Sequence, residues 1–128
     1  MRKANVAVDI DGTLTEYRYD SAQPEKIGPL TWRGKLLLEQ LNEAGYKVVL
    51  FTGRINETGS NSELALKVIQ DWVDSNAIGH LISRIWPHPK PDIIAIVDDR
   101  AVRWRGDPEL SFAEVKGNER YLETLRCP

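Results

Sequence analysis

Residues 6–13 read Val6-Ala7-Val8-Asp9-Ile10-Asp11-Gly12-Thr13, a short apolar run that ends in two aspartates and a glycine. Because the run is rich in β-branched residues and bounded by a turn signal, it predicts a buried strand followed by a tight turn. Three further apolar runs of similar character follow, at residues 48–51, 81–85 and 93–97. The second of the four runs ends at Thr52, and the fourth ends at Asp98 and Asp99.

Two stretches between these runs carry apolar residues at helical spacing. The apolar positions of the first are Trp32, Leu36 (or Leu37), Leu41 and Ala44, and Gly45 is a stop signal. The second contains Leu64, Val68 and Trp72 after a capping-box pair, Ser60 and Glu63. A last helical segment is expected over about residues 111–125, interrupted by Gly117. Short strands that alternate with helices predict an α/β fold: one Rossmann-like, three-layer domain whose central parallel sheet is covered on both faces.

Length and composition exclude several classes of protein. The 128 residues fit a single domain, with a motif-bearing core at about residues 6–106 and a tail at 107–128. A net charge of −2 indicates no extended nucleic-acid surface, and no apolar run is long enough to span a membrane. Cys127 is the only cysteine, which excludes an internal disulfide and fits a cytoplasmic location.

Polar residues collect at one predicted edge of the sheet. In parallel sheets, ligands bind beyond the carboxyl ends of the strands, where Asp9, Asp11, Asp98 and Asp99 are expected. Two carboxylates about 4 Å apart repel each other by about 4 kcal/mol at an effective dielectric of 20, so a cation is expected among them. Oxygen ligands without Cys or His nearby favour Mg²⁺.

Four motifs in order resemble those of the haloacid dehalogenase-like (HAD) hydrolase superfamily. Val8-Asp9-Ile10-Asp11-Gly12-Thr13-Leu14 looks like its first motif and Phe51-Thr52-Gly53-Arg54 like its second. Lys90-Pro91 resembles the third and Val97-Asp98-Asp99 the acidic fourth. Together they cover about residues 6–106 and resemble those of small members without a cap domain.

The resemblance implies a Mg²⁺-dependent phosphomonoester hydrolase that works through an aspartyl-phosphate. Asp9 would be the nucleophile and Asp11 the general acid and base, while Thr52, Gly53 and Lys90 would bind phosphate. The implied metal ligands are Asp9, the backbone carbonyl of Asp11, Asp98, and Asp99 either directly or through water. Dehalogenases lack the second aspartate, so Asp11 indicates a phosphatase. Lys90 lies only eight residues before Asp98, and Lys67 is the alternative lysine.

Several interpretations stay open at this point. A catalytically slow or idle binding protein of the same fold is one alternative, and a phosphoacceptor module such as a receiver domain is another. The phosphorylated substrate has no sequence signature, and a second copy of the chain could cover the open site. Arg54 could touch phosphate, although pairing with an acidic neighbour is preferred. Trp32 and Trp72 are expected in the core, and Tyr17 and Tyr19 are candidates for substrate contact in a loop or flap before residue 31.

Overall fold

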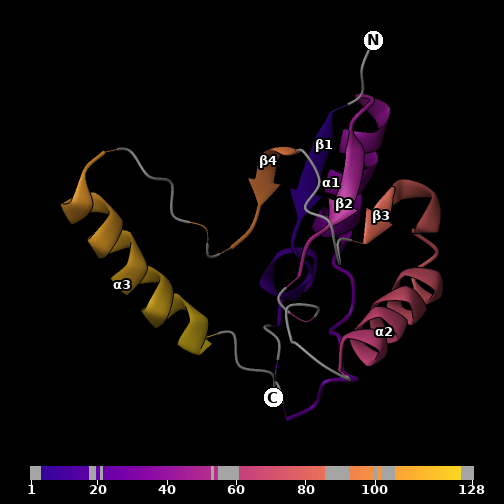
Figure 1. Cartoon of the computed structure of the whole chain (residues 1–128), viewed down its shortest axis with the longest axis horizontal. Helices are drawn as coiled ribbons and strands as arrows, with labels where there is room; N and C mark the ends of the chain where they lie inside the picture. The colour runs from indigo at the N-terminus through magenta and orange to yellow at the C-terminus, as the bar shows by residue number, and fades with distance from the viewer. Residues whose placement is uncertain are drawn as a thin grey trace.

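The computed structural model describes residues 4–17, 20, 22–52, 54, 61–85, 93–99, 101 and 106–124. Its sheet consists of β1 (Asn5–Val8), β2 (Lys47–Leu50), β3 (Arg84–Ile85) and β4 (Ile93–Val97). All the pairings are parallel, and the strand order is β3-β2-β1-β4, as Figure 1 shows. The predicted α/β fold with a parallel sheet is therefore confirmed.

The first helix begins and ends where local chemistry predicts. α1 (Trp32–Glu43) is capped by the side chain of Thr31, which accepts a hydrogen bond of 3.0 Å from the amide of Gly34. This bond satisfies one of the amide donors that the first helical turn leaves without an intrahelical partner. The helix ends just before Gly45, whose φ of +88° belongs to the left-handed region.

The other helices differ in part from the prediction. α2 (Asn61–Ser75) agrees with it, although the expected cap at Ser60 lies outside the described residues. α3 (Pro108–Thr124) continues through Gly117, so the predicted interruption is wrong. A single glycine costs only about 1 kcal/mol in a helix, which the rest of α3 tolerates. The predicted strand at 81–85 is shortened, because Leu81 belongs to the short helical turn η3 (Gly79–Leu81).

The hydrophobic core lies between one face of the sheet and the first two helices. Val6, Val8, Val48 and Leu50 share this face because side chains alternate along a strand and these residues pair in register. The helical residues of the same cluster are Leu38 of α1 and Ile69, Trp72 and Val73 of α2. Both crossovers step in the same direction along the sheet, and residues of both helices belong to this one cluster, so the two helices cover the same face.

The edge strand β4 is less covered than the sequence predicted. Ala7 and Val49, on the opposite face of β1 and β2, are fully buried, so these central strands are buried on both faces. In β4, by contrast, Ile96 is 48% exposed. Helix α3 follows β4 in sequence but lies to the side of the sheet (Figure 1), and its Phe112 and Val115 are exposed. β1 and β2 are thus buried on both faces, the expected coverage of both faces is wrong for β4, and the third layer of the predicted three-layer domain stays a prediction.

The two tryptophans expected in the core have different environments. Trp32 is 70% exposed, which contradicts the prediction. It is the first residue of α1, and the buried face of this helix is formed instead by Gly34 and Leu38. Trp72 is buried as predicted. Among the described residues, no helix combines the length and apolar character needed to cross a membrane.

Candidate functional site

The backbone ladder brings the ends of three strands together around Asp9. The amide of Asp9 donates a hydrogen bond to the carbonyl of Val97 at 2.9 Å. The amide of Phe51 donates one to the carbonyl of Val8 at 3.0 Å. Asp9 is therefore flanked by the residues that follow β4 on one side and β2 on the other. Because β2 and β4 lie on opposite sides of β1, the chain direction across the sheet reverses here, which is where open α/β sheets bind ligands.

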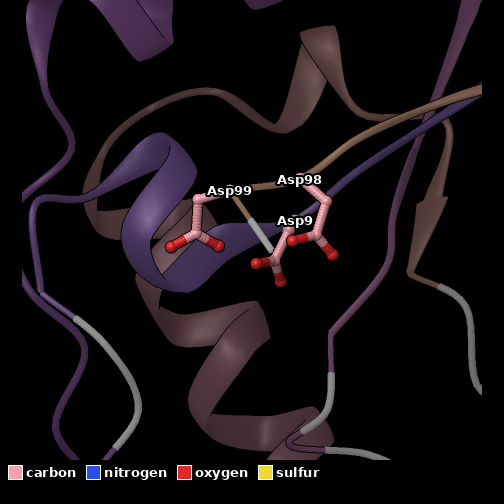
Figure 2. A group of neighbouring side chains, drawn as sticks. All are labelled: Asp9, Asp98 and Asp99. Atoms are coloured by element: carbon pink, nitrogen blue, oxygen red, sulfur yellow. The ribbon is translucent and has the colours of Figure 1, made fainter. Parts of the chain in front are cut away.

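Three carboxylates meet at this point. Asp9, Asp98 and Asp99 each offer an oxygen atom, and these oxygens all lie within 4.8 Å of one another. Figure 2 shows the three side chains gathered beyond the ends of β1 and β4. Asp9 is only 8% exposed, and the other two are partly buried. The predicted grouping of Asp9 with Asp98 and Asp99 is therefore present in the structure.

The electrostatics of this cluster favour a bound cation. The pKa of Asp9 is raised to about 7, chiefly by burial and next by the neighbouring charge of Asp98. The charges of Asp11 and Asp99 add smaller contributions, whereas the backbone hydrogen bond from Ile10 opposes the shift. A divalent cation among the three carboxylates would favour their ionised forms. Three carboxylates with hard oxygen donors fit Mg²⁺ or another hard cation.

Gly12 allows the turn after β1 to approach this cluster. It lies within the short helical turn η1 (Ile10–Leu14) and has a φ of +82°, a conformation that favours glycine. A Cβ atom at this position would overlap the carboxylate of Asp99 and lie 2.9 Å from its Cγ atom. The first motif and the fourth motif are therefore in direct contact, which only a residue without a side chain permits.

Asp11, which was expected to group with the other three aspartates, is not part of this cluster, and its carboxylate binds Arg54 instead. The Arg54 Nε atom donates to Asp11 Oδ2 and the Nη2 atom to Asp11 Oδ1, each at 2.7 Å. Both residues are buried, at 4% exposure for Asp11 and 3% for Arg54. The preferred interpretation of Arg54 as the partner of an acidic neighbour is confirmed. The proposed role of the Asp11 carbonyl as a metal ligand stays a prediction.

Thr52 lies at the same edge of the sheet and is buried. Its Oγ1 atom accepts a hydrogen bond of 3.2 Å from the amide of Arg54. A hydroxyl that accepts one bond still has its own proton to donate, so Thr52 can serve as a donor to an anion. The other two residues assigned to phosphate, Gly53 and Lys90, lie outside the described residues, as does Tyr19.

Side chains of Arg54 and Trp72 donate hydrogen bonds to the segment before α1, which was expected to be a loop or flap. Arg54 donates from Nη1 to the carbonyl of Pro24 at 3.0 Å and from Nη2 to that of Lys26 at 2.7 Å. The indole nitrogen of Trp72 donates to the carbonyl of Gly28 at 2.9 Å. Sequence reasoning missed these contacts, because a backbone carbonyl can accept a bond at any residue type and leaves no signal in the sequence.

A cavity of about 530 Å³ borders the turn that carries Gly12. It is lined by polar and aromatic residues of three segments: Gly12, Thr13, Thr15, Glu16 and Tyr17, then Thr31, Trp32 and Arg33, and finally Tyr121 and Thr124 of α3. Tyr17, a candidate for substrate contact, therefore lines a cavity that includes Gly12, whereas Asp9, Asp98 and Asp99 are not among its lining residues. The guanidinium of Arg33 lies 5.1 Å from the ring centre of the exposed Trp32.

Comparison with known proteins found no matching family model, no matching curated protein and no matching solved structure. A function can therefore be inferred only from the residues of the site and the motifs that contain them.

Proposed function

We propose that the protein is a Mg²⁺-dependent phosphomonoester hydrolase of the small, capless HAD type, with a Rossmann-like domain. The observation that carries the proposal is the meeting of Asp9, Asp98 and Asp99, whose carboxylate oxygens lie within 4.8 Å of one another. These residues belong to two different motifs, and Asp9 and Asp98 are 89 positions apart in the sequence. The parallel pairing of β1 with β4 brings them to the point where such sheets bind ligands.

In this proposal, Asp9 attacks the phosphorus atom of the substrate and the ester oxygen leaves. An aspartyl-phosphate on Asp9 is then hydrolysed by water, which regenerates the carboxylate and releases inorganic phosphate. Asp11 gives a proton to the leaving oxygen and afterwards takes one from the attacking water. The hydroxyl of Thr52 donates to a phosphate oxygen, and Gly53 and Lys90 take the phosphate-binding roles that the motif resemblance implies.

Asp9, Asp98 and Asp99, with the backbone carbonyl of Asp11, would hold the Mg²⁺ ion. When bound, the ion neutralises negative charge on the phosphate and on the carboxylates around it. Burial, and after it the charge of Asp98, raise the pKa of Asp9 to about 7 and so oppose the ionisation that a nucleophile needs; a cation held by these carboxylates would favour the ionised form.

The strand order favours this proposal over a receiver domain. Receiver-type sheets have the order 2-1-3-4-5, in which the first strand lies between the second and the third. In this chain β1 lies between β2 and β4, as in the order 3-2-1-4 of Rossmann-like sheets. A phosphoacceptor aspartate would also be expected after the third strand, where this sequence continues with Trp86.

The test is hydrolysis of p-nitrophenyl phosphate by the wild type and by Asp9→Asn, each with and without Mg²⁺. Turnover that requires Mg²⁺ and is lost in the variant supports the proposal. Equal turnover by both proteins rules out Asp9 as the nucleophile. Absence of turnover on a broad panel of phosphate esters, with Mg²⁺ still bound, would instead favour an idle binding protein.

A further inference from the structure

The most completely bonded side chain in the described site is that of Arg54, and the proposed reaction gives it no role. Its Nε, Nη1 and Nη2 atoms all donate hydrogen bonds, two to the carboxylate of Asp11 and two to the carbonyls of Pro24 and Lys26. The four donor–acceptor distances are between 2.7 and 3.0 Å. This geometry fixes the guanidinium plane, and with it the plane of the Asp11 carboxylate.

Arg54 joins three segments that are distant in sequence. It follows β2 by four residues, Asp11 lies in the turn after β1, and Pro24 and Lys26 belong to the segment before α1. Trp72 of α2 holds the same segment through Gly28. The position of the Asp11 carboxylate is therefore set by Arg54, which follows β2. Arg54 is in turn bonded to the segment before α1, which α2 contacts through Trp72.

Stability alone is a poor reason for this buried pair. Removing two charges from water costs several kcal/mol per ion, so apolar residues of similar volume often stabilise a fold equally well. A guanidinium does what apolar packing cannot: it orients a carboxylate through two parallel bonds. Each oxygen of Asp11 uses one lone pair for Arg54 and retains another, on which a proton in transit can be carried.

We propose that Arg54 is a positioning residue for proton transfer by Asp11. This inference rests on the proposed function, in which Asp11 protonates the leaving oxygen. Proton transfer needs donor and acceptor within about 2.6–3.2 Å, and the bidentate pair holds Asp11 in one orientation while the site binds its substrate. Lysine in place of Arg54 retains the charge but cannot form the two parallel bonds.

The role of Arg54 is tested by comparing kcat/KM for two substrates whose leaving groups differ in their need for protonation. An ester with a good leaving group, such as p-nitrophenyl phosphate, needs little protonation, whereas an alkyl ester such as glycerol 2-phosphate needs a well-placed acid. We expect Arg54→Lys to lower kcat/KM on the order of 10²-fold for the alkyl ester and less than about 10-fold for the aryl ester. In an Asp11→Asn background, the same substitution should leave the ratio of the two values unchanged.

The matched control is Arg84→Lys on the exposed edge strand β3, which should change neither value. If Arg54→Lys does not fold, Trp72→Phe replaces it: this variant stays apolar but loses the bond to Gly28, and it should shift the ratio in the same direction by a smaller factor. An equal loss of kcat/KM for both esters would overturn the role of Arg54 and leave the proposed function intact. Failure of the wild type to hydrolyse either ester, or any other phosphate ester, would overturn the proposed function, and the role of Arg54 with it.

Discussion

Two aspartates lie two residues apart at the end of β1, and both are buried, yet they have opposite electrostatic surroundings. Asp9 has carboxylates of Asp98 and Asp99 as neighbours, and its pKa is raised to about 7. Asp11 has both of its oxygens bonded to the guanidinium of Arg54. The first group carries an excess of negative charge, and the second pair is neutral as a unit when Asp11 is ionised.

The difference shows what each group needs from outside the chain. The Arg54–Asp11 pair is complete within the protein, because the positive charge and the hydrogen-bond donors come from the same fold. The carboxylate cluster is a set of like charges at short range, which a cation stabilises and which protonation relieves. In the proposed function, this strand end would thus combine a fixed acid–base residue with a site for an exchangeable ion.

The largest expected effect is on activity, from a change in the acidic cluster. Asp9→Asn should reduce phosphatase turnover on the order of 10⁴-fold or more, because it removes the attacking carboxylate. Steady-state assays with an aryl phosphate and Mg²⁺ measure this loss, and Asp71→Asn on the exposed face of α2 is the control that should retain full activity. Substantial activity in Asp9→Asn would remove this residue from the reaction.

The next effect is on stability, from a change in the neutral pair. Arg54→Met leaves the Asp11 carboxylate buried without its partner, and this should lower the free energy of unfolding by about 3–5 kcal/mol. Urea unfolding measures the change. The double variant Arg54→Met/Asp11→Leu should recover most of the loss, because no buried charge remains; a double variant as unstable as Arg54→Met would show that the charges are not the cause.

A third prediction compares the response of the cluster to pH and metal. The folded-state pKa of Asp9, about 7, exceeds its ordinary value of 3.8, so the folded metal-free protein holds a proton that the unfolded chain has lost. Its free energy of unfolding should therefore fall as pH rises from about 4 to 7, on the order of a few kcal/mol. Thermal unfolding should also show that Mg²⁺ raises Tm more at pH 8 than at pH 5.

Asp9→Asn is the control for this third prediction, because it removes the titrating group and should flatten the dependence on pH across this range. The same slope in Asp9→Asn as in the wild type would assign it to another residue.

The smallest expected effect concerns the contact between the turn and the cluster. Gly12→Ala introduces a Cβ atom at a φ of +82° and against the carboxylate of Asp99, so it should cost about 1–3 kcal/mol of stability. Titration with Mg²⁺ should show weaker binding as Asp99 is displaced. Gly117→Ala is the comparison, because nothing lies within 4 Å of the added atom and the site is in a helix; it should be neutral or stabilising.

Much of the fold was predictable because local patterns and burial agree along most of the chain. The β1, β2 and β4 runs and the first two helices follow from apolar periodicity and from signals such as Gly45, which marks the end of α1. The exposure of Trp32 was not predictable. Trp32 is the first residue of α1, and apolar spacing alone does not show whether a residue in the first turn of a helix faces the sheet or the solvent. The partial exposure of Ile96 depends on where α3 lies, which no residue of β4 encodes.

For the candidate site, the sequence by itself determined which chemical groups stand at the strand ends: Asp9, Thr52, Asp98 and Asp99. Parallel strands place their carboxyl ends at one edge, so the type of residue after each strand already indicates an oxygen-rich cation site. Only the tertiary structure decided that Asp11 faces Arg54 and that Arg54 holds the carbonyls of Pro24 and Lys26. Side-chain direction and pairing over 43 residues depend on how the segments pack together, and the spacing of residues along the chain does not contain that information.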